Sequence, residues 1–256
     1  MKFTVDCDSL SKALDSVQVK GKGSTGNGFG NTSFGTYADI VVSGNNLSVW
    51  NANATFCAKV DIVLEGETID GTVCVDSRTI IPYLKSFEET VTFSIGDFIA
   101  MNSDVKKASV PRVVTHPNAD SLNRLKNMLN HIRYEIRPET LFTFGNSNFE
   151  GAFTVTQKQL KEAIKNCEIV KSGIYKFDYN NNLLTVSSRE NVMNKYEEVI
   201  TPVFPIGEPA TVEFSNAVYS FFDSPQLINI YMRDEFPLLL VSTDRVLLKA
   251  PTVNGD

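Results

Sequence analysis

Residues 1–17 read MKFTVDCDSLSKALDSV and residues 151–167 read GAFTVTQKQLKEAIKNC, and the two stretches follow one pattern. Both contain the triplet Phe-Thr-Val, which alternates as a short strand does, and the second triplet stands 150 positions after the first. An amphipathic helix is predicted after each triplet, over Asp8–Val17 and over Thr156–Cys167, and the first residue of each helix is a good N-cap. The chain therefore contains an internal duplication.

Each copy continues with the same order of elements. Two strands joined by an Asn-rich or Gly-rich turn come next, followed by a longer strand, a short strand, a second helix and three closing strands. The strands predicted in the first copy are Tyr37–Val42, Leu47–Trp50, Thr55–Leu64, Thr72–Val75, Val91–Ile95, Phe98–Asn102 and Lys107–Val113, and its second helix is Ser77–Phe87. Those predicted in the second copy are Ile174–Asp178, Leu183–Val186, Asn194–Val203, Thr211–Phe214, Leu227–Met232, Leu238–Ser242 and Val246–Ala250, with a second helix over Asn216–Phe222. Because short turns join most strands, we expect antiparallel sheets with two helices on one face of each, an α+β fold.

The duplication divides the chain into two domains and a connector. We place the N-terminal domain at 1–114, the interdomain connector at 115–150 and the C-terminal domain at 151–256. Within the connector, apolar residues at helical spacing predict an additional helix over Ala119–Ile136.

The bulk composition is that of a folded chain. Hydrophobic residues make up 42% and charged residues 21% of 256 positions, which is enough to bury a core. No apolar run could span a membrane and no apolar signal stretch opens the chain, so we expect an intracellular protein without membrane contact, in the cytoplasm or nucleoid, or in the nucleus or host cell of a eukaryote or virus. Four widely spaced cysteines, Cys7, Cys57, Cys74 and Cys167, predict reduced and buried thiols.

The net charge of −6 argues against a nucleic-acid-binding protein unless the basic residues gather on one surface. Counting 100° per residue gives three of the helices an apolar inner stripe. The stripes are Leu10, Ala13, Leu14 and Val17; Ile80, Tyr83, Leu84 and Phe87; and Leu160, Ala163, Ile164 and Cys167. The basic residues on the outer faces of these helices, or near their ends, are Lys12, Lys20, Lys22, Arg78, Lys85, Lys158, Lys161, Lys165 and Lys171.

Two interpretations of these basic residues stay open. Lys and Arg contact phosphates without reporting the base, and a lysine surface without stacking aromatics suits sliding along a duplex. The alternative is an ordinary solvated helix face. The fourth predicted helix favours the alternative, because its outward residues are Asn216, Ser220 and Asp223, none of them basic.

Several segments resemble the DNA sliding clamps. Phe236–Val241 and Leu248–Val253 are similar to the closing strand pair and tail of PCNA, and Tyr219–Phe222 is similar to the second helix of its second domain. The opening Met1–Val5 with its helix also resembles the bacterial β clamp, which is more distant. The resemblance implies duplicated sliding-clamp domains with antiparallel sheets and two helices per domain on the inner face of a ring.

The resemblance also implies a function and partners. It implies a DNA polymerase processivity factor that encircles double-stranded DNA without sequence preference and recruits replication and repair proteins. Two domains per chain imply a head-to-tail homotrimer put onto DNA by a clamp loader. The strands that would pair between subunits are Lys107–Val113 of one chain and part of Asn194–Val203 of the next.

A docking pocket for client peptides is a further implication of the resemblance. The pocket residues carried over by the family match are Pro237, Ala250, Pro251 and Val253, and the connector residues chosen to complete the pocket are Leu141 and Phe142. The alternative is that the two prolines only limit strand pairing at the sheet edge.

No motif in the chain predicts catalysis or a cofactor. Residues 21–26 spell GxGxxG, but they follow a predicted helix and precede an antiparallel strand, whereas a dinucleotide site needs the motif between a strand and a helix. The sequence has no CxxC pair, HExxH motif or GxSxG motif. We therefore expect a protein that is not an enzyme and that binds no cofactor or metal.

Two other hypotheses stay open. The chain could keep the clamp fold without the ring, as a monomeric or hetero-oligomeric accessory factor. It could also be an unrelated duplicated α+β structural protein, for instance a virion component.

Overall fold

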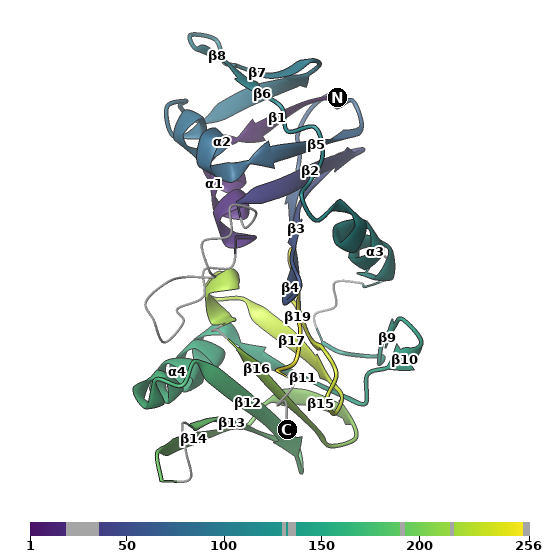
Figure 1. The fold of residues 1–256 in the computed structure, drawn as a ribbon, viewed down its shortest axis with the longest axis vertical. Helices are drawn as coiled ribbons and strands as arrows, with labels where there is room; N and C mark the ends of the chain where they lie inside the picture. The colour runs from purple at the N-terminus through teal and green to yellow at the C-terminus, as the bar shows by residue number, and fades with distance from the viewer. Residues whose placement is uncertain (19–35, 130–131, 133–136, 190–192, 216–217, 253–256) are drawn as a thin grey trace. The chain divides into compact units, whose positions relative to one another are not determined.

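The computed structural model describes residues 1–18, 36–129, 132, 137–189, 193–215 and 218–252 (Figure 1). These residues form two compact units, each with its own set of internal contacts. The described residues of unit 1 are 1–18, 36–53 and 58–123, and those of unit 2 are 54–57 and 124–252. The predicted Lys20 and Lys22 and the Gly-rich stretch 21–30 lie outside the described residues.

Unit 1 contains strands in two groups and two helices. The first group has the order β1 (Lys2–Asp6), β6 (Thr90–Ile95), β7 (Phe98–Asn102) and β8 (Lys107–Pro111). The second has the order β5 (Gly71–Asp76), β2 (Tyr37–Ser43), β3 (Asn46–Ala52) and β4 (Phe56–Val63), and the first two residues of β4 belong to unit 2. The helices α1 (Cys7–Ser16) and α2 (Ser77–Leu84) pack against each other (Figure 1). Helix α3 (Ala119–Leu129) follows β8 along the chain.

Unit 2 repeats this plan. Its first strand group has the order β14 (Lys195–Ile200), β13 (Leu183–Arg189), β12 (Ile174–Asn180) and β16 (Ala210–Ser215), and its second has the order β15 (Val203–Gly207), β11 (Gly151–Thr156), β17 (Leu227–Met232), β18 (Leu238–Val241) and β19 (Arg245–Lys249). Helix α4 (Gln157–Cys167) packs on β13 and β14 and continues into the 3₁₀ turn η1 (Glu168–Val170). A second 3₁₀ turn, η2 (Tyr219–Phe221), lies beside α4, and the short hairpin β9 (Thr143–Phe144) and β10 (Ser147–Asn148) precedes β11.

The sequence-based fold class is confirmed. The ladders within each four-stranded group that begins with β1 or β14 are antiparallel, and so are those that join β11, β17, β18 and β19. The turn at Asn181 and Asn182 has φ angles of 50° and 60°, as the predicted Asn-rich hairpin turn requires. The result is an α+β protein whose sheets are antiparallel at all of these ladders, as predicted.

The helix starts differ in one detail from the prediction. Thr156 caps α4 as predicted, in a capping box with Gln159. Asp6, not Asp8, caps α1, because its carboxylate accepts a hydrogen bond of 2.7 Å from the Ser9 amide. The helix therefore begins one residue before the predicted start, at Cys7.

The predicted apolar stripes of α1 and α4 are all buried, and burial of each large side chain contributes about 1.5–3 kcal/mol. In α2 the prediction was wrong for Tyr83, which is 40% exposed, and the helix ends at Leu84 rather than at Phe87. Pro82 lies inside this helix, where it lacks the amide hydrogen that the helix would use.

The predicted fourth helix over Asn216–Phe222 is wrong within the described residues. Only the 3₁₀ turn η2 forms there, and residues 216–217 are not described. Phe221 and Phe222 are consecutive and both buried, so their side chains must leave the backbone in different directions. Phe222 accordingly has extended backbone angles, which end the turn.

Three further elements differ from the prediction. The strand expected over Asn194–Val203 is two strands, β14 and β15, separated at Thr201 and Pro202, since proline has no amide hydrogen to donate to a ladder. The predicted connector helix Ala119–Ile136 is observed as α3 to Leu129, and residues 130–131 and 133–136 are not described. The hairpin β9–β10 was not predicted.

Candidate nucleic-acid and partner-binding surfaces

Helix α4 carries three of the predicted phosphate contacts. Its inner stripe is fully buried, and the resulting rotation leaves Lys158 and Lys165 exposed and Lys161 half-buried on the outer side. Glu162 lies 3.8 Å from the Lys158 ammonium group, an exposed i, i+4 pair of the kind that contributes at most about 1 kcal/mol. With three lysines and one glutamate, the helix has an excess of two positive charges.

Lys171 extends this basic surface beyond η1. The residue is exposed and has a left-handed φ of 61°, which closes the 3₁₀ turn through a hydrogen bond from its amide to the Glu168 carbonyl. The chain therefore places Lys171 close behind α4 in space as well as in sequence.

Unit 1 has a weaker basic surface. Lys12 is exposed on α1, but Asp8 and Asp15 are exposed on the same helix. The Arg78 guanidinium donates to Asp76 at 3.2 and 3.4 Å, and Lys85 is exposed at the end of α2. The Asp76 carboxylate raises the pKa of Arg78 through these hydrogen bonds and its charge. Arg78 is therefore already partnered by a carboxylate.

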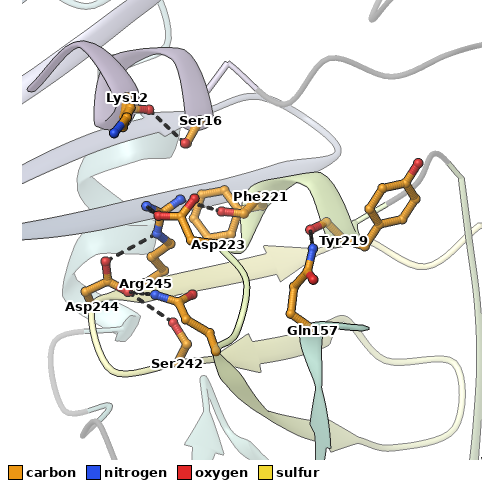
Figure 2. Close-up of polar contacts among 10 residues, drawn as sticks. Lys12, Ser16, Gln157, Tyr219, Phe221, Asp223, Ser242, Asp244 and Arg245 are labelled. Atoms are coloured by element: carbon orange, nitrogen blue, oxygen red, sulfur yellow. Dashed lines mark hydrogen bonds and ion pairs between the residues drawn. The ribbon is translucent and has the colours of Figure 1, made fainter. Parts of the chain in front are cut away.

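A buried arginine, Arg245, lies in the region where the fourth helix was predicted. Its side chain is 5% exposed, and it donates a 2.7 Å hydrogen bond to the Phe221 carbonyl and pairs with the carboxylates of Asp223 and Asp244 (Figure 2). Asp244 also accepts hydrogen bonds from Gln226 and Ser242. Two carboxylates thus surround one guanidinium, and the η2 region has no excess of positive charge.

Sequence reasoning did not identify Arg245. Its partners Phe221 and Asp223 lie 24 and 22 positions earlier, so helical or strand periodicity gives no sign of the contact. The available signal was a charged residue at the start of the apolar run Val246–Leu248.

The predicted pocket residues that are described lie in unit 2. Leu141, Pro237, Ala250 and Pro251 are half-buried, whereas Phe142 is 8% exposed, and Val253 is outside the described residues. Phe142 packs against Tyr231, with 4.8 Å between the ring centroids. The Phe142 side chain is therefore already in contact with the sheet that contains β17.

Phe142 is part of an aromatic cluster that the sequence reasoning missed. The connector residues Phe144 and Phe149 pack against Phe236, with centroid distances of 5.9 and 5.6 Å, and Phe149 also lies 6.0 Å from Tyr231. The signal in the sequence was the spacing of three phenylalanines over 142–149, just before β11.

Two of the edge strands bear on the predicted contact between subunits. These are β8 in unit 1 and β14 in unit 2, and among the described strands each is paired on one side only. They fall within the two segments predicted to pair between subunits. Such a strand presents a row of backbone donors and acceptors to a second chain.

Other chemical features of the described residues are structural. All four cysteines are free and buried, and burial raises the pKa of the Cys57 thiol to about 12. Burial lowers the pKa of Lys249, in β19, to about 8. Within the described residues, no group of three or more His, Cys, Asp or Glu side chains could hold a metal ion, and no helix is long and apolar enough to cross a membrane.

Comparison with known proteins identifies the architecture. No family model and no curated protein sequence matches the chain. Among solved structures, the DNA polymerase III β subunit of Thermotoga maritima superposes with a TM-score of 0.74 at 15% identity, and that of Pseudomonas aeruginosa with 0.72 at 12%. PCNA of A. fulgidus, solved with the C-terminal region of FEN-1, gives 0.66 at 14%.

The chain has the fold of a DNA sliding clamp. All three alignments cover 100% of this chain, and they cover 66% of each bacterial β subunit and 99% of the archaeal PCNA. The clamp fold of this chain thus has the length of the archaeal protein and spans about two thirds of the bacterial ones.

Proposed function

We propose that this protein is a sliding clamp, a non-enzymatic processivity factor that encircles duplex DNA and recruits a DNA polymerase and other replication and repair proteins. The observation that carries the proposal is the clamp fold over the whole chain, at a length matching 99% of the archaeal PCNA. By analogy with that match, the assembly is a homotrimer, put onto DNA by a clamp loader. Fold alone does not determine function, so the proposal needs support from the surfaces of the chain.

The lysines of α4 support the DNA contact. Lys158, Lys161, Lys165 and the nearby Lys171 give unit 2 a basic surface in a protein of net charge −6. In the proposed ring this surface faces the hole and contacts phosphates, which carry no sequence information. Lys12, Arg78 and Lys85 have the same role from unit 1, with Arg78 contributing less because Asp76 already binds it.

Edge strands support the assembly. We propose that β8 of one subunit pairs with β14 of the next, since each has an open side. The contact joins two different surfaces, so it is heterologous and closes a ring only if the rotation between subunits is right.

The half-buried residues Leu141, Pro237, Ala250 and Pro251 support a client-peptide site on unit 2. In this proposal the pocket takes a short peptide segment of a polymerase or another client. Phe142 contributes from the connector, although its ring is already packed on Tyr231.

One experiment tests the ring and the DNA contact together. The native mass of the assembly is measured first, and the protein is then loaded onto a nicked circular plasmid with a clamp loader and passed over a sizing column. A clamp stays with the circle and is lost when the plasmid is linearised. Equal retention on circular and linear DNA, or a monomeric mass, would contradict the ring.

A second candidate keeps the fold without the ring, as a monomeric or hetero-oligomeric accessory factor. It is favoured by the η2 region, where Asp223 and Asp244 enclose Arg245 and leave no basic surface. A monomer that still stimulates polymerase extension on linear primed DNA is the result that this candidate predicts.

A further inference from the structure

The face of the unit 2 sheet that carries the predicted pocket is covered by the connector. Tyr231 is opposite Leu239, and Leu239 is opposite Leu248, so these three side chains share one face of β17, β18 and β19. Strand alternation places Pro237 and Ala250, next to the ends of β18 and β19, on this same face. The packing of Phe142 and Phe149 on Tyr231 identifies it as the face toward the connector.

The covering segment is small and its attachments are few. Residues 142–149, which we call the flap, contain two-residue strands with the pairs Ser147–Phe144 and Asn148–Thr143, and the Phe149 amide donates to the Phe142 carbonyl at 3.0 Å. An isolated two-stranded hairpin is marginally stable, so the flap depends on what it packs against. It packs on Tyr231 and Phe236, which we call the aromatic platform.

One arginine holds the flap to the platform. Arg233 donates to the Asn148 carbonyl at 3.3 Å, pairs with the Glu150 carboxylate at 3.4 Å and lies 5.6 Å from the centre of the Phe236 ring. The Arg233 and Glu150 side chains are 36% and 42% exposed, so solvent weakens their attraction. The flap is therefore held by aromatic packing and by exposed polar contacts that water can replace.

We propose that the flap occupies the aromatic platform in cis, and that the platform accepts an aromatic-bearing peptide segment of a partner protein only when the flap lifts. The argument for this partner is the present occupant, because Phe142, Phe144 and Phe149 of the chain itself already bind the platform. The inference rests on the proposed clamp function for its partner, and it adds a device that regulates the same site. Only molecules with an open flap can bind, so the apparent affinity for a partner equals the intrinsic affinity multiplied by the fraction of molecules that are open.

The test uses the flap's own sequence as the probe. A fluorescent peptide of residues 140–150, TLFTFGNSNFE, is titrated into the full-length protein and into the double variant F142A/F144A, with binding followed by anisotropy. The variant has lost two flap rings, so we expect it to bind the peptide at least about tenfold more tightly than the parent does. A Phe98→Ala variant, which removes a 54% exposed ring in unit 1, is the matched control and should bind as the parent does.

Equal affinity of parent and double variant, or no binding to a double variant with a parent-like thermal unfolding curve, overturns the proposal. Arg233→Gln provides a second measurement that keeps every ring. Hydrogen exchange at the Phe149 amide should become faster in this variant while the amides of β17 and β18 do not change. If the flap amides exchange only as fast as those of β17 and β18, in parent and variant alike, the flap is part of the core and the proposal fails.

These outcomes are separate from those of the proposed function. The peptide and exchange assays need neither DNA nor a ring. A chain that fails to stay on circular DNA can still pass them, and a true clamp can still fail them.

Discussion

Neutralising the α4 lysines should weaken DNA binding by an amount that the structure bounds. We consider the triple variant K158Q/K161Q/K165Q, which keeps good helix formers on the outer face and leaves the buried stripe intact. Each lysine that contacts a phosphate contributes about 0.9 to the slope of log affinity against log salt. Three full contacts per subunit would therefore remove about 2.7 from that slope.

Two observations reduce this expectation. Lys158 shares its charge with Glu162 at 3.8 Å, and Lys161 is half-buried, so fewer than three full contacts are available. We expect a loss of about 1–2 in the slope for each subunit on the DNA. For a slope loss of about 2, the ratio of parent to variant affinity should fall about 16-fold between about 50 mM and 200 mM salt.

The assay is anisotropy of a short labelled duplex, titrated with protein over a series of salt concentrations. The control variant, K2Q/R124Q/K176Q, removes three positive charges at positions outside the predicted DNA surface. A parent-like slope in the α4 variant would refute the assignment of α4 to DNA. An equal loss in the control would mean that net charge, rather than this helix face, determines binding.

Four further predictions concern stability. Thr156→Ala removes the α4 capping box and should lower the free energy of unfolding in urea by about 1 kcal/mol; an unchanged urea midpoint would contradict the cap. The Ser9 hydrogen bonds lower the pKa of Asp6, so the stability that the Asp6 carboxylate contributes is present above its unfolded-state pKa and is lost as pH falls through its folded-state pKa. Asp6→Asn, still a good cap, should flatten this acid dependence of the free energy of unfolding, and a parent-like pH profile would count against the assignment. Arg245→Gln should cost about 2–3 kcal/mol and loosen the η2 region in hydrogen exchange, whereas a local effect without loss of stability would show that the pair network is only superficial. Burial lowers the pKa of Lys249 to about 8, so the parent should gain stability as pH rises from about 8 toward the unfolded value. Lys249→Met should lack this gain, and a parent-like pH profile of the Met variant would show that another group causes it.

The sequence pattern predicted the elements that depend on residues close together in the chain. Helix α4 was predicted with its cap and its buried stripe, because Thr156 and Leu160–Cys167 carry both signals within a dozen positions. The Asn-rich turn at Asn181 needed only two adjacent residues that tolerate positive φ. The order of elements along the chain followed the duplication, and together with the motifs that resemble sliding clamps it indicated the clamp fold.

Long-range contacts explain what the sequence did not predict. In the η2 region a turn stands in place of the expected helix, and Arg245 binds there a carbonyl and a carboxylate more than 20 positions away in the sequence. The flap is likewise defined by Tyr231 and Phe236, far from Phe142 in the chain. Periodicity detects which face of an element is apolar, but it does not identify the partner that the face will meet.

The open sides of β8 and β14 also have a consequence for the newly made chain. Such a strand can pair with any other extended segment, including the same strand of another copy in a wrong register. β14 carries the ion-paired Lys195 and Glu197 together with Glu198, and Pro111 ends β8 with a residue that cannot donate to a ladder. Charges and a terminal proline of this kind disfavour misaligned stacking, so they reduce the tendency of these edges to aggregate.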